Sequence, residues 1–359
     1  MMRRMGVAMV SLTLIVGCAS AGDGSGRPSG SIPPASVSAS GTGGGNGTLY
    51  TSVDSPRTTD QFPGWTTTIT AHPINVDGSL GPATAVLSGP ADDTSYPGVI
   101  DGVGGNVVTG SFTNYWTTDL ELRSAGQVTA KVPAPRWCGG EGLSGNLCVL
   151  LDDARMARTT ELGRDPISGA GPTEASILIS SLVDGSALAE WGPVPDLTTM
   201  LGTESPDEVL LVTYEYRTVD QPAGPSTVLR MDTTDGSTTE VATSPDGWSP
   251  LCPVGRDSVL GFTLQDIPSQ GVIRTTATSV LLGPGTIADI RWDVEDTVGC
   301  SADGRFLYLE DTPEPPTGEA DGSEVPNPPT TVERITLADG TSETVAVLEP
   351  GVRTLRITR

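Results

Sequence analysis

The chain has 359 residues, and 44 acidic residues against 20 basic ones give it a formal net charge of −24. Nucleic-acid binding needs clustered basic side chains that neutralise phosphates, so this composition excludes nucleic acid as a partner. It also excludes docking on anionic lipid by charge, which means that any membrane attachment has to come from a lipid.

The first residues predict export and lipidation. Arg3 and Arg4 precede an apolar run from Gly6 to Gly17, which is shorter than the roughly 20 residues of a membrane-spanning helix and has the length of a signal-peptide core. The run ends directly before Cys18 and resembles the lipobox of bacterial lipoproteins. This resemblance implies a signal peptide over residues 1–17, acylation of Cys18 and a lipid-anchored protein on the extracytoplasmic face of the cell membrane. An ordinary signal peptide with an incidental cysteine is the alternative.

Residues 18–47 are almost entirely Ser, Gly, Ala, Pro and Thr after the cysteine. Such a segment buries too little apolar surface to offset its chain entropy, so we expect a flexible linker followed by a folded domain over residues 48–359. Lys131 is the only lysine in the chain. This bias towards arginine is typical of GC-rich, actinobacterial-type genomes.

Six tight turns recur in the folded part, each between runs rich in Val, Leu, Ile and Thr. Four are Asp-Gly pairs, which favour two-residue hairpins because both residues tolerate a positive φ. The turns are Asp77-Gly78, Ala125-Gly126, Asp184-Gly185, Asp235-Gly236, Pro284-Gly285 and Asp339-Gly340. Their glycines are 48 to 59 residues apart, which predicts an all-β, six-bladed β-propeller with four strands in each blade.

A second repeat, out of phase with the first, joins a turn to an apolar run. We expect each copy to contain the turn between the two inner strands of a blade and the second strand, which is buried on both faces. The copies are GGNVVTGSF from Gly104, SGNLCVLLD from Ser144, SPDEVLLVTYE from Ser205, GRDSVLGFT from Gly255 and SADGRFLYLE from Ser301. SADGRFLYLE in particular resembles the SPDGR-type repeat of TolB-like and WD-like propellers. That resemblance implies a protein-interaction module of the cell envelope.

The two ends of the folded part are expected to close the ring. Thr48 to Val53 is typical of a second strand with no first strand before it, and Val352 to Arg359 is a strand with no blade after it. Pairing them makes the C-terminal strand the innermost strand of the first blade and removes an exposed sheet edge. A pair of stacked β-sandwiches is the alternative architecture, although it leaves the regular spacing of the turns unexplained.

Four cysteines follow Cys18, and an even number in an exported chain predicts two disulfides. Cys138 and Cys148 flank a short predicted turn between the first two strands of one blade. Cys252 and Cys300 occupy similar positions on the innermost strands of neighbouring blades. We therefore expect the pairs Cys138–Cys148 and Cys252–Cys300, and the absence of zinc-ligand spacing excludes a structural zinc site.

Ligand contacts are expected on one face, where the blade-to-blade links meet the connections between second and third strands. The predicted insertions between second and third strands are Asp153 to Pro172, Arg217 to Pro225, Gln265 to Arg274 and Asp311 to Thr330. We call this the loop-rich face, because loops on a rigid scaffold commonly carry binding residues. Its candidate residues are Trp137, Trp248, Trp292, Tyr96, Arg136 and Arg291. The alternative is that these tryptophans pack between blades.

Candidates for catalysis are few. His72 is the only histidine, which argues against a Ser/His/Asp triad or a Cys/His pair. Lactonase-like propellers hold calcium through oxygen ligands, and carboxylates lie near the predicted channel entrances at Glu141, Asp246, Asp293, Glu295 and Asp296. Calcium needs about 6–8 oxygen ligands, and no loop here is spaced to supply them. We therefore expect solvated charges and no cofactor.

Two functions follow from these observations. The first is a membrane-anchored lipoprotein whose propeller binds a protein, peptide or cell-envelope ligand on its loop-rich face. The second is a calcium-dependent hydrolase or lyase that acts on sugars or lactones through channel carboxylates. Convergent carboxylates in the channel favour the enzyme, whereas an arginine-lined channel favours the binding protein.

Overall fold

The computed structural model describes residues 46–56, 65–91, 95–113, 116–133, 147–160, 174–214, 224–269, 272–311 and 329–359. The chain divides into two compact units, and all of the described residues belong to the unit Gly41–Arg359. The predicted signal peptide, Cys18 and nearly all of the predicted linker lie outside the described residues. The described part of the chain contains no helix that is both long and apolar enough to cross a membrane.

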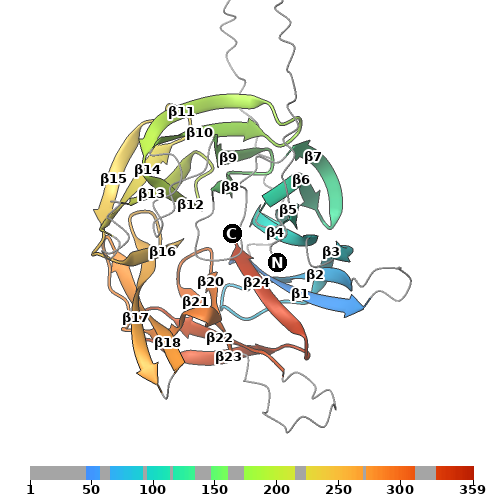
Figure 1. Cartoon of the computed structure of the whole chain (residues 1–359), viewed down its shortest axis with the longest axis vertical. Helices are drawn as coiled ribbons and strands as arrows, with labels where there is room; N and C mark the ends of the chain where they lie inside the picture. The colour runs from blue at the N-terminus through green and yellow to red at the C-terminus, as the bar shows by residue number, and fades with distance from the viewer. Residues whose placement is uncertain are drawn as a thin grey trace, which may run out of the picture. The chain divides into compact units, whose positions relative to one another are not determined.

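Six antiparallel four-stranded sheets form the blades of a β-propeller, which confirms the predicted fold (Figure 1). We name the strands of each blade from the channel outward. Blade 1 contains β24 (Val352–Thr358), β1 (Thr48–Pro56), β2 (Trp65–Pro73) and β3 (Thr84–Ala91). Blade 2 contains β4 (Ser95–Val103), β5 (Asn106–Thr113), β6 (Trp116–Ser124) and β7 (Gln127–Pro133). Blade 3 contains β8 (Cys148–Leu150), β9 (Arg155–Thr159), β10 (Glu174–Ser181) and β11 (Ala187–Pro195).

The second half of the ring follows the same order. Blade 4 contains β12 (Leu197–Gly202), β13 (Glu208–Tyr214), β14 (Ser226–Asp232) and β15 (Thr238–Thr243). Blade 5 contains β16 (Trp248–Pro253), β17 (Val259–Ser269), β18 (Val272–Leu282) and β19 (Arg291–Asp293). Blade 6 contains β20 (Thr297–Cys300), β21 (Phe306–Asp311), β22 (Thr331–Thr336) and β23 (Ser342–Val347), and a 3₁₀ turn, Val294–Asp296, leads into it.

The core is divided into six apolar clusters, one at each junction between neighbouring blades. At the junction of blades 3 and 4, for example, Ile177 packs in one cluster with Met200 and Leu211. Both faces of a middle strand are therefore covered by protein, and β13 is buried almost without interruption. This explains why such strands have nearly continuous apolar sequences instead of alternating ones.

Pairing between β24 and β1 closes the ring, as predicted. The register runs from Thr48 opposite Thr358 to Val53 opposite Val352, with one irregularity at Tyr50/Thr51. Because β24 is the innermost strand of blade 1, the first and last strands of the propeller form one sheet (Figure 1). The pairing satisfies backbone N–H and C=O groups that an open sheet would expose at its edge.

All six predicted turns connect the third and fourth strands of their blades, but most are not two-residue hairpins. Only Ala125-Gly126 has that form, with positive φ at both residues and Ser124 paired to Gln127. At Asp235-Gly236 the loop has four residues, because the Asp232 N–H donates to Ser237 O and the Gly236 N–H donates to Asp232 O.

The aspartate of each Asp-Gly turn holds the residue that follows the glycine. Asp184 Oδ1 accepts hydrogen bonds from the N–H and hydroxyl of Ser186, at 3.0 and 2.8 Å. Asp77, Asp235 and Asp339 accept the equivalent N–H from Ser79, Ser237 and Thr341. A short carboxylate that bonds the backbone two residues on stabilises a turn without requiring a positive φ at the aspartate. The glycine alone takes the left-handed conformation.

Four copies of the second repeat lie where they were predicted, and the prediction for SGNLCVLLD was wrong. Its apolar run forms β8, the innermost strand of blade 3, and the second strand is β9. The predicted insertion from Asp153 to Pro172 therefore contains a strand. β8 is itself fully buried, so its apolar sequence imitates that of a second strand, and Asp152 turns the chain directly after it by accepting from Ala154 and Arg155 N–H.

The predicted insertion from Gln265 to Arg274 was also wrong. β17 and β18 remain paired up to Ser269 and Val272, so this segment lengthens a hairpin instead of forming a separate loop. The insertions predicted from Arg217 to Pro225 and from Asp311 to Thr330 join second to third strands, and most of their residues lie outside the described part of the chain.

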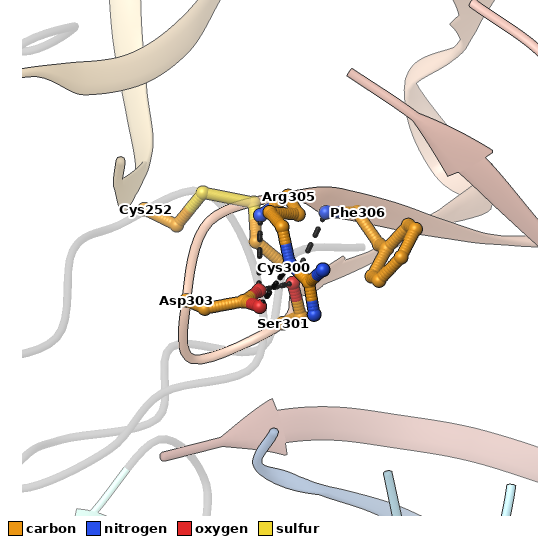
Figure 2. The surroundings of a disulfide bond; sticks show 6 residues. All are labelled: Cys252, Cys300, Ser301, Asp303, Arg305 and Phe306. Carbon is orange, nitrogen blue, oxygen red and sulfur yellow. Dashed lines mark hydrogen bonds and ion pairs between the residues drawn. A yellow bond between two sulfur atoms is a disulfide. The ribbon is translucent and has the colours of Figure 1, made fainter. Parts of the chain in front are cut away.

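The expected disulfide between Cys252 and Cys300 is present, with a Cα–Cα distance of 6.2 Å (Figure 2). It joins β16 to β20, the innermost strands of blades 5 and 6. Directly after Cys300, the SADGR turn is held by its own side chains: the Ser301 hydroxyl donates to Asp303 Oδ1 at 2.7 Å, and the Phe306 N–H donates to Ser301 Oγ at 3.0 Å. Cys148 is buried on β8, and its predicted partner Cys138 lies outside the described residues.

The Asp-Gly turns predict a dependence of stability on pH. Hydrogen bonds from Ser186 lower the pKa of Asp184, so its carboxylate stabilises the fold above the unfolded pKa of about 3.9 and loses this effect as the pH falls through the folded value. Asp184→Ala should lower the melting temperature at neutral pH, and the difference from the unmodified protein should shrink as the pH is lowered from about 5 to about 2. Circular dichroism measures both temperatures. Asp153→Ala, at an exposed site, is the control, and a difference that stays constant with pH would contradict the assigned role.

The disulfide predicts a loss of stability when it is removed. The bond closes a sequence separation of 48 residues, for which the chain-entropy relation gives a stabilisation of about 4 kcal/mol. The double variant Cys252→Ser/Cys300→Ser should lose about this much free energy of unfolding in denaturant titrations under non-reducing conditions. Each single variant should lose the same free energy of unfolding, because either substitution removes the bond. Variants that are as stable as the unmodified protein would show that the bond does not restrain the unfolded chain.

Candidate functional site

A cavity of about 220 Å³ lies where the innermost strands of several blades end. Its walls come from β12, β16, β20 and β24, with Asp101 contributed by β4. In each of these strands the lining residues are at or near the C-terminal end. That end leads into the turns between first and second strands, so the cavity lies at the end of the channel opposite the loop-rich face.

Arg359 crosses this cavity and contacts blades other than its own. Its Nη1 donates to the carbonyl oxygen of Thr203, after β12, and its Nη2 donates to that of Leu150, in β8. The Nη2 atom also lies 3.8 Å from Asp101 Oδ2. One side chain that follows the closing strand therefore connects blades 2, 3 and 4.

Asp101 is the acidic side chain that forms an ion pair with this guanidinium. Its Oδ2 accepts the Leu150 N–H at 2.7 Å, and its Oδ1 accepts the Gly102 N–H at 2.9 Å. The Asp101 and Arg359 side chains are 15% and 16% exposed, so the pair is largely removed from solvent. Two N–H donors and an arginine thus surround this carboxylate.

Arg356 is the second guanidinium of the cavity. It lines the cavity, and its Nη1 donates to the carbonyl oxygen of Ile100, in β4. Burial lowers the pKa of Arg356, and the charge of Asp101 opposes this shift. Because a guanidinium in a protein keeps its proton at all ordinary pH values, both arginines carry a positive charge here.

Glycine makes room for the closing strand at two places. A Cβ atom on Gly202 would lie 2.1 Å from the guanidinium carbon of Arg359, and one on Gly102 would lie 2.7 Å from Thr358 Oγ1. Both distances are far below van der Waals contact. A side chain at either position would displace the residues that follow or end β24.

Of the predicted ligand-face residues, the two tryptophans that the structure describes are buried. The Trp248 ring is fully buried, with its Nε1 3.4 Å from Val280 O, and the Tyr214 hydroxyl donates to Trp248 O at 2.5 Å. Trp292 is 5% exposed and its Nε1 donates to Thr297 Oγ1 at 2.7 Å. Both rings belong to apolar clusters at blade junctions, as in the alternative considered above.

Two positions within this group were predicted wrongly. Arg291 and Trp292 belong to β19, the outermost strand of blade 5, and not to the link that follows it. The sequence did not predict this strand, because it has three residues and does not follow the Pro284-Gly285 turn directly. Arg291 is exposed and lies 3.4 Å from Asp289. Tyr96 is on β4, but its side chain is not described, and Arg136 and Trp137 lie outside the described residues.

Among the described residues, no group of three or more His, Cys, Asp or Glu is placed to hold a metal ion. Of the carboxylates considered for calcium, Asp246, Asp293 and Asp296 are described, the side chain of Glu295 is not, and Glu141 lies outside the described part. His72 lies on β2, where Thr51 Oγ1 is 3.1 Å from its Nε2 and burial lowers its pKa. The cavity itself presents guanidinium groups, and this donor chemistry suits an anion instead of a cation.

The charged residues that line the cavity, Asp101, Arg356 and Arg359, were not predicted from the sequence. The C-terminal segment RTLRITR contains three of the chain's 20 basic residues, and it was recognised only as a strand. This segment was predicted as the innermost strand of blade 1, and the innermost strands line the channel. That prediction alone implies that arginines of this segment lie beside the channel. No local pattern marks Asp101 as a cavity residue, because its partner Arg359 lies 258 positions away in the sequence.

The burial of Trp248 predicts a structural role. Trp248→Ala should lower the free energy of unfolding by about 3–5 kcal/mol, the usual cost of removing a fully buried large aromatic side chain. Denaturant titration measures this loss. Val183→Ala, in an exposed turn, is the control and should leave stability nearly unchanged. A stable Trp248→Ala variant would contradict the packing role.

Comparison with known proteins supports no assignment beyond the fold. Neither protein families nor curated proteins gave a match. Among solved structures, the chain is similar to a TolB from Agrobacterium tumefaciens (11% identity, TM-score 0.37, covering 87% of this chain and 99% of that one). It is also similar to an oligogalacturonate lyase from Vibrio parahaemolyticus (8%, 0.38, covering 84% and 86%) and to oligopeptidase B from Leishmania major (11%, 0.38, covering 84% and 49%). Values this low carry no functional argument, and the six four-stranded sheets themselves define the chain as a six-bladed β-propeller.

Proposed function

We propose that this chain is an exported lipoprotein, anchored to the membrane through acylated Cys18, whose propeller binds a protein, peptide or cell-envelope ligand. The observation that carries the proposal is the composition of the channel cavity. Arg356 and Arg359 occupy it and donate to backbone carbonyl groups of neighbouring blades. An arginine-lined channel favours a binding protein over an enzyme that works through convergent carboxylates and calcium.

The place where the chain enters the propeller supports a ligand on the loop-rich face. The Asn46 side chain accepts the Asp303 N–H at 2.9 Å, and its backbone oxygen accepts the Ala302 N–H at 2.8 Å. Both partners belong to a turn between first and second strands. Asn46, where the described part of the chain begins, is thus held at the end of the channel opposite the loop-rich face, and this supports a partner on the loop-rich face.

The anchor is tested by lipid labelling in cells. Cys18→Ala should abolish incorporation of a labelled fatty acid and release the protein from the membrane fraction, because the acylated sulfur is removed. Ser20→Ala, two residues further on, is the matched control and should leave both properties unchanged. Membrane retention of the Cys18→Ala protein would overturn the lipid anchor.

Binding is tested by photo-crosslinking on the native membrane from two engineered positions. Glu349 lies in the link between β23 and β24, on the loop-rich face, and Val183 lies in a turn on the opposite face; both are exposed. A crosslinking residue at 349 should capture a specific partner, and the same residue at 183 should not. Absence of a specific partner, together with chelator-sensitive turnover of a sugar or lactone, would overturn the binding function in favour of the enzyme.

A further inference from the structure

We propose that the channel cavity is a binding site for a carboxylate group, held between the guanidinium groups of Arg356 and Arg359. The carboxylate belongs either to a small free acid or to the C-terminus of a peptide. This site lies at the opposite end of the channel from the loop-rich face. It is therefore independent of the partner proposed for that face.

Arg356 forms no ion pair with the described residues, whereas Arg359 lies close to Asp101. The acidic residues among its described lining are Asp101 and Glu204, and Glu204 is exposed at the rim. Inside the cavity, the acidic side chain beside the two arginines is that of Asp101. A charge held away from water is costly unless it is paired, so an anion that enters the cavity is stabilised by Arg356.

Hydrogen-bond donors are available to such an anion. A guanidinium has five N–H donors, and within the described structure Arg356 uses one of them, towards Ile100 O. Arg359 uses Nη1 and Nη2 towards Thr203 O and Leu150 O, and its charge still acts on the cavity. The planar fork of arginine matches the two oxygens of a carboxylate. The donor groups of Arg356 thus favour a carboxylate over a neutral ligand.

The size and walls of the cavity restrict the ligand further. A volume of about 220 Å³ is below the roughly 300–1,000 Å³ of sites for drug-sized molecules. The remaining walls are largely apolar and include Met200, Leu251, Val298 and the Cys252–Cys300 disulfide. The cavity therefore fits a carboxylate with a short apolar tail or the last residues of a peptide. The net charge of −24 on the whole chain disfavours polyanions.

Isothermal titration of the full-length protein in detergent tests the proposal. The probes are propionate, N-acetyl-alanyl-alanine and the C-terminal amide of the same dipeptide. Saturable binding is expected for at least one of the two acids, with at least tenfold weaker binding of the amide. If propionate binds and the peptide acid does not, the ligand is a small acid; if the peptide acid binds more tightly, it is a chain terminus. Equal binding of acid and amide, or no binding of either acid, would overturn the proposal.

Two variants on one strand assign the site. Arg356→Gln should weaken binding of the acid at least tenfold, whereas Arg353→Gln should not change it. Arg353 lies on the same strand, but its side chain is 54% exposed and lies 3.5 Å from Asp54 Oδ2, outside the cavity lining. Unchanged affinity of a folded Arg356→Gln protein would overturn the site.

Two further measurements keep the test decisive if Arg356→Gln does not fold. The comparison of acid with amide on the unmodified protein needs no variant. Gly202→Ala pushes a methyl group against the Arg359 guanidinium and should weaken acid binding while leaving Arg356 in place. Full affinity in a folded Gly202→Ala protein would show that Arg359 has no part in the site.

Discussion

Closure of the ring by the β1–β24 pairing is the interaction on which the rest of the structure depends. Each blade buries its middle strands only because a neighbouring blade covers them, and the six apolar clusters lie at the six junctions. Without β24, blade 1 would have β1 as an open edge, and the junctions on both sides of it would lose a strand. An unpaired edge strand also offers its N–H and C=O groups to other chains. The pairing from Thr48/Thr358 to Val53/Val352 thus supports all six junctions together.

The junction between blade 6 and blade 1 has additional polar contacts. The Tyr308 hydroxyl donates to Gly78 O at 2.9 Å, and the guanidinium groups of Arg305 and Arg334 donate to the carbonyl groups of Val76 and Asp77. The Arg334 guanidinium also lies 4.9 Å from the centre of the Phe306 ring. On the other side of blade 6, the disulfide provides a covalent link to blade 5. The last blade before the closure is therefore fixed at both of its junctions.

The closing strand also determines the chemistry of the channel. Because β24 is innermost, Arg356 lies beside the cavity and Arg359 reaches across it to blades 3 and 4. Gly202 accepts this arrangement since it has no side chain to collide with the guanidinium. The same residues thus connect blades and place positive charge in the channel of an acidic protein. Stability and any ligand of the cavity are coupled, as an anion bound to Arg356 would stabilise the folded ring by mass action.

Local sequence determined the all-β class, the count of six blades, the closure and the pairing of Cys252 with Cys300. These features depend on turn residues and on the order of the strands. Both can be recognised from short segments such as Asp184-Gly185 and SADGR. The sequence misplaced β8, β9 and β19, because innermost strands and second strands are both buried and a three-residue strand has no periodicity. Only the tertiary structure decided that Trp248 and Trp292 belong to the core and that Asp101 meets Arg359. The two tryptophans are buried only because neighbouring blades pack against each other, and Asp101 and Arg359 are 258 positions apart in the sequence. These contacts arise from the geometry of the closed ring instead of from any local pattern.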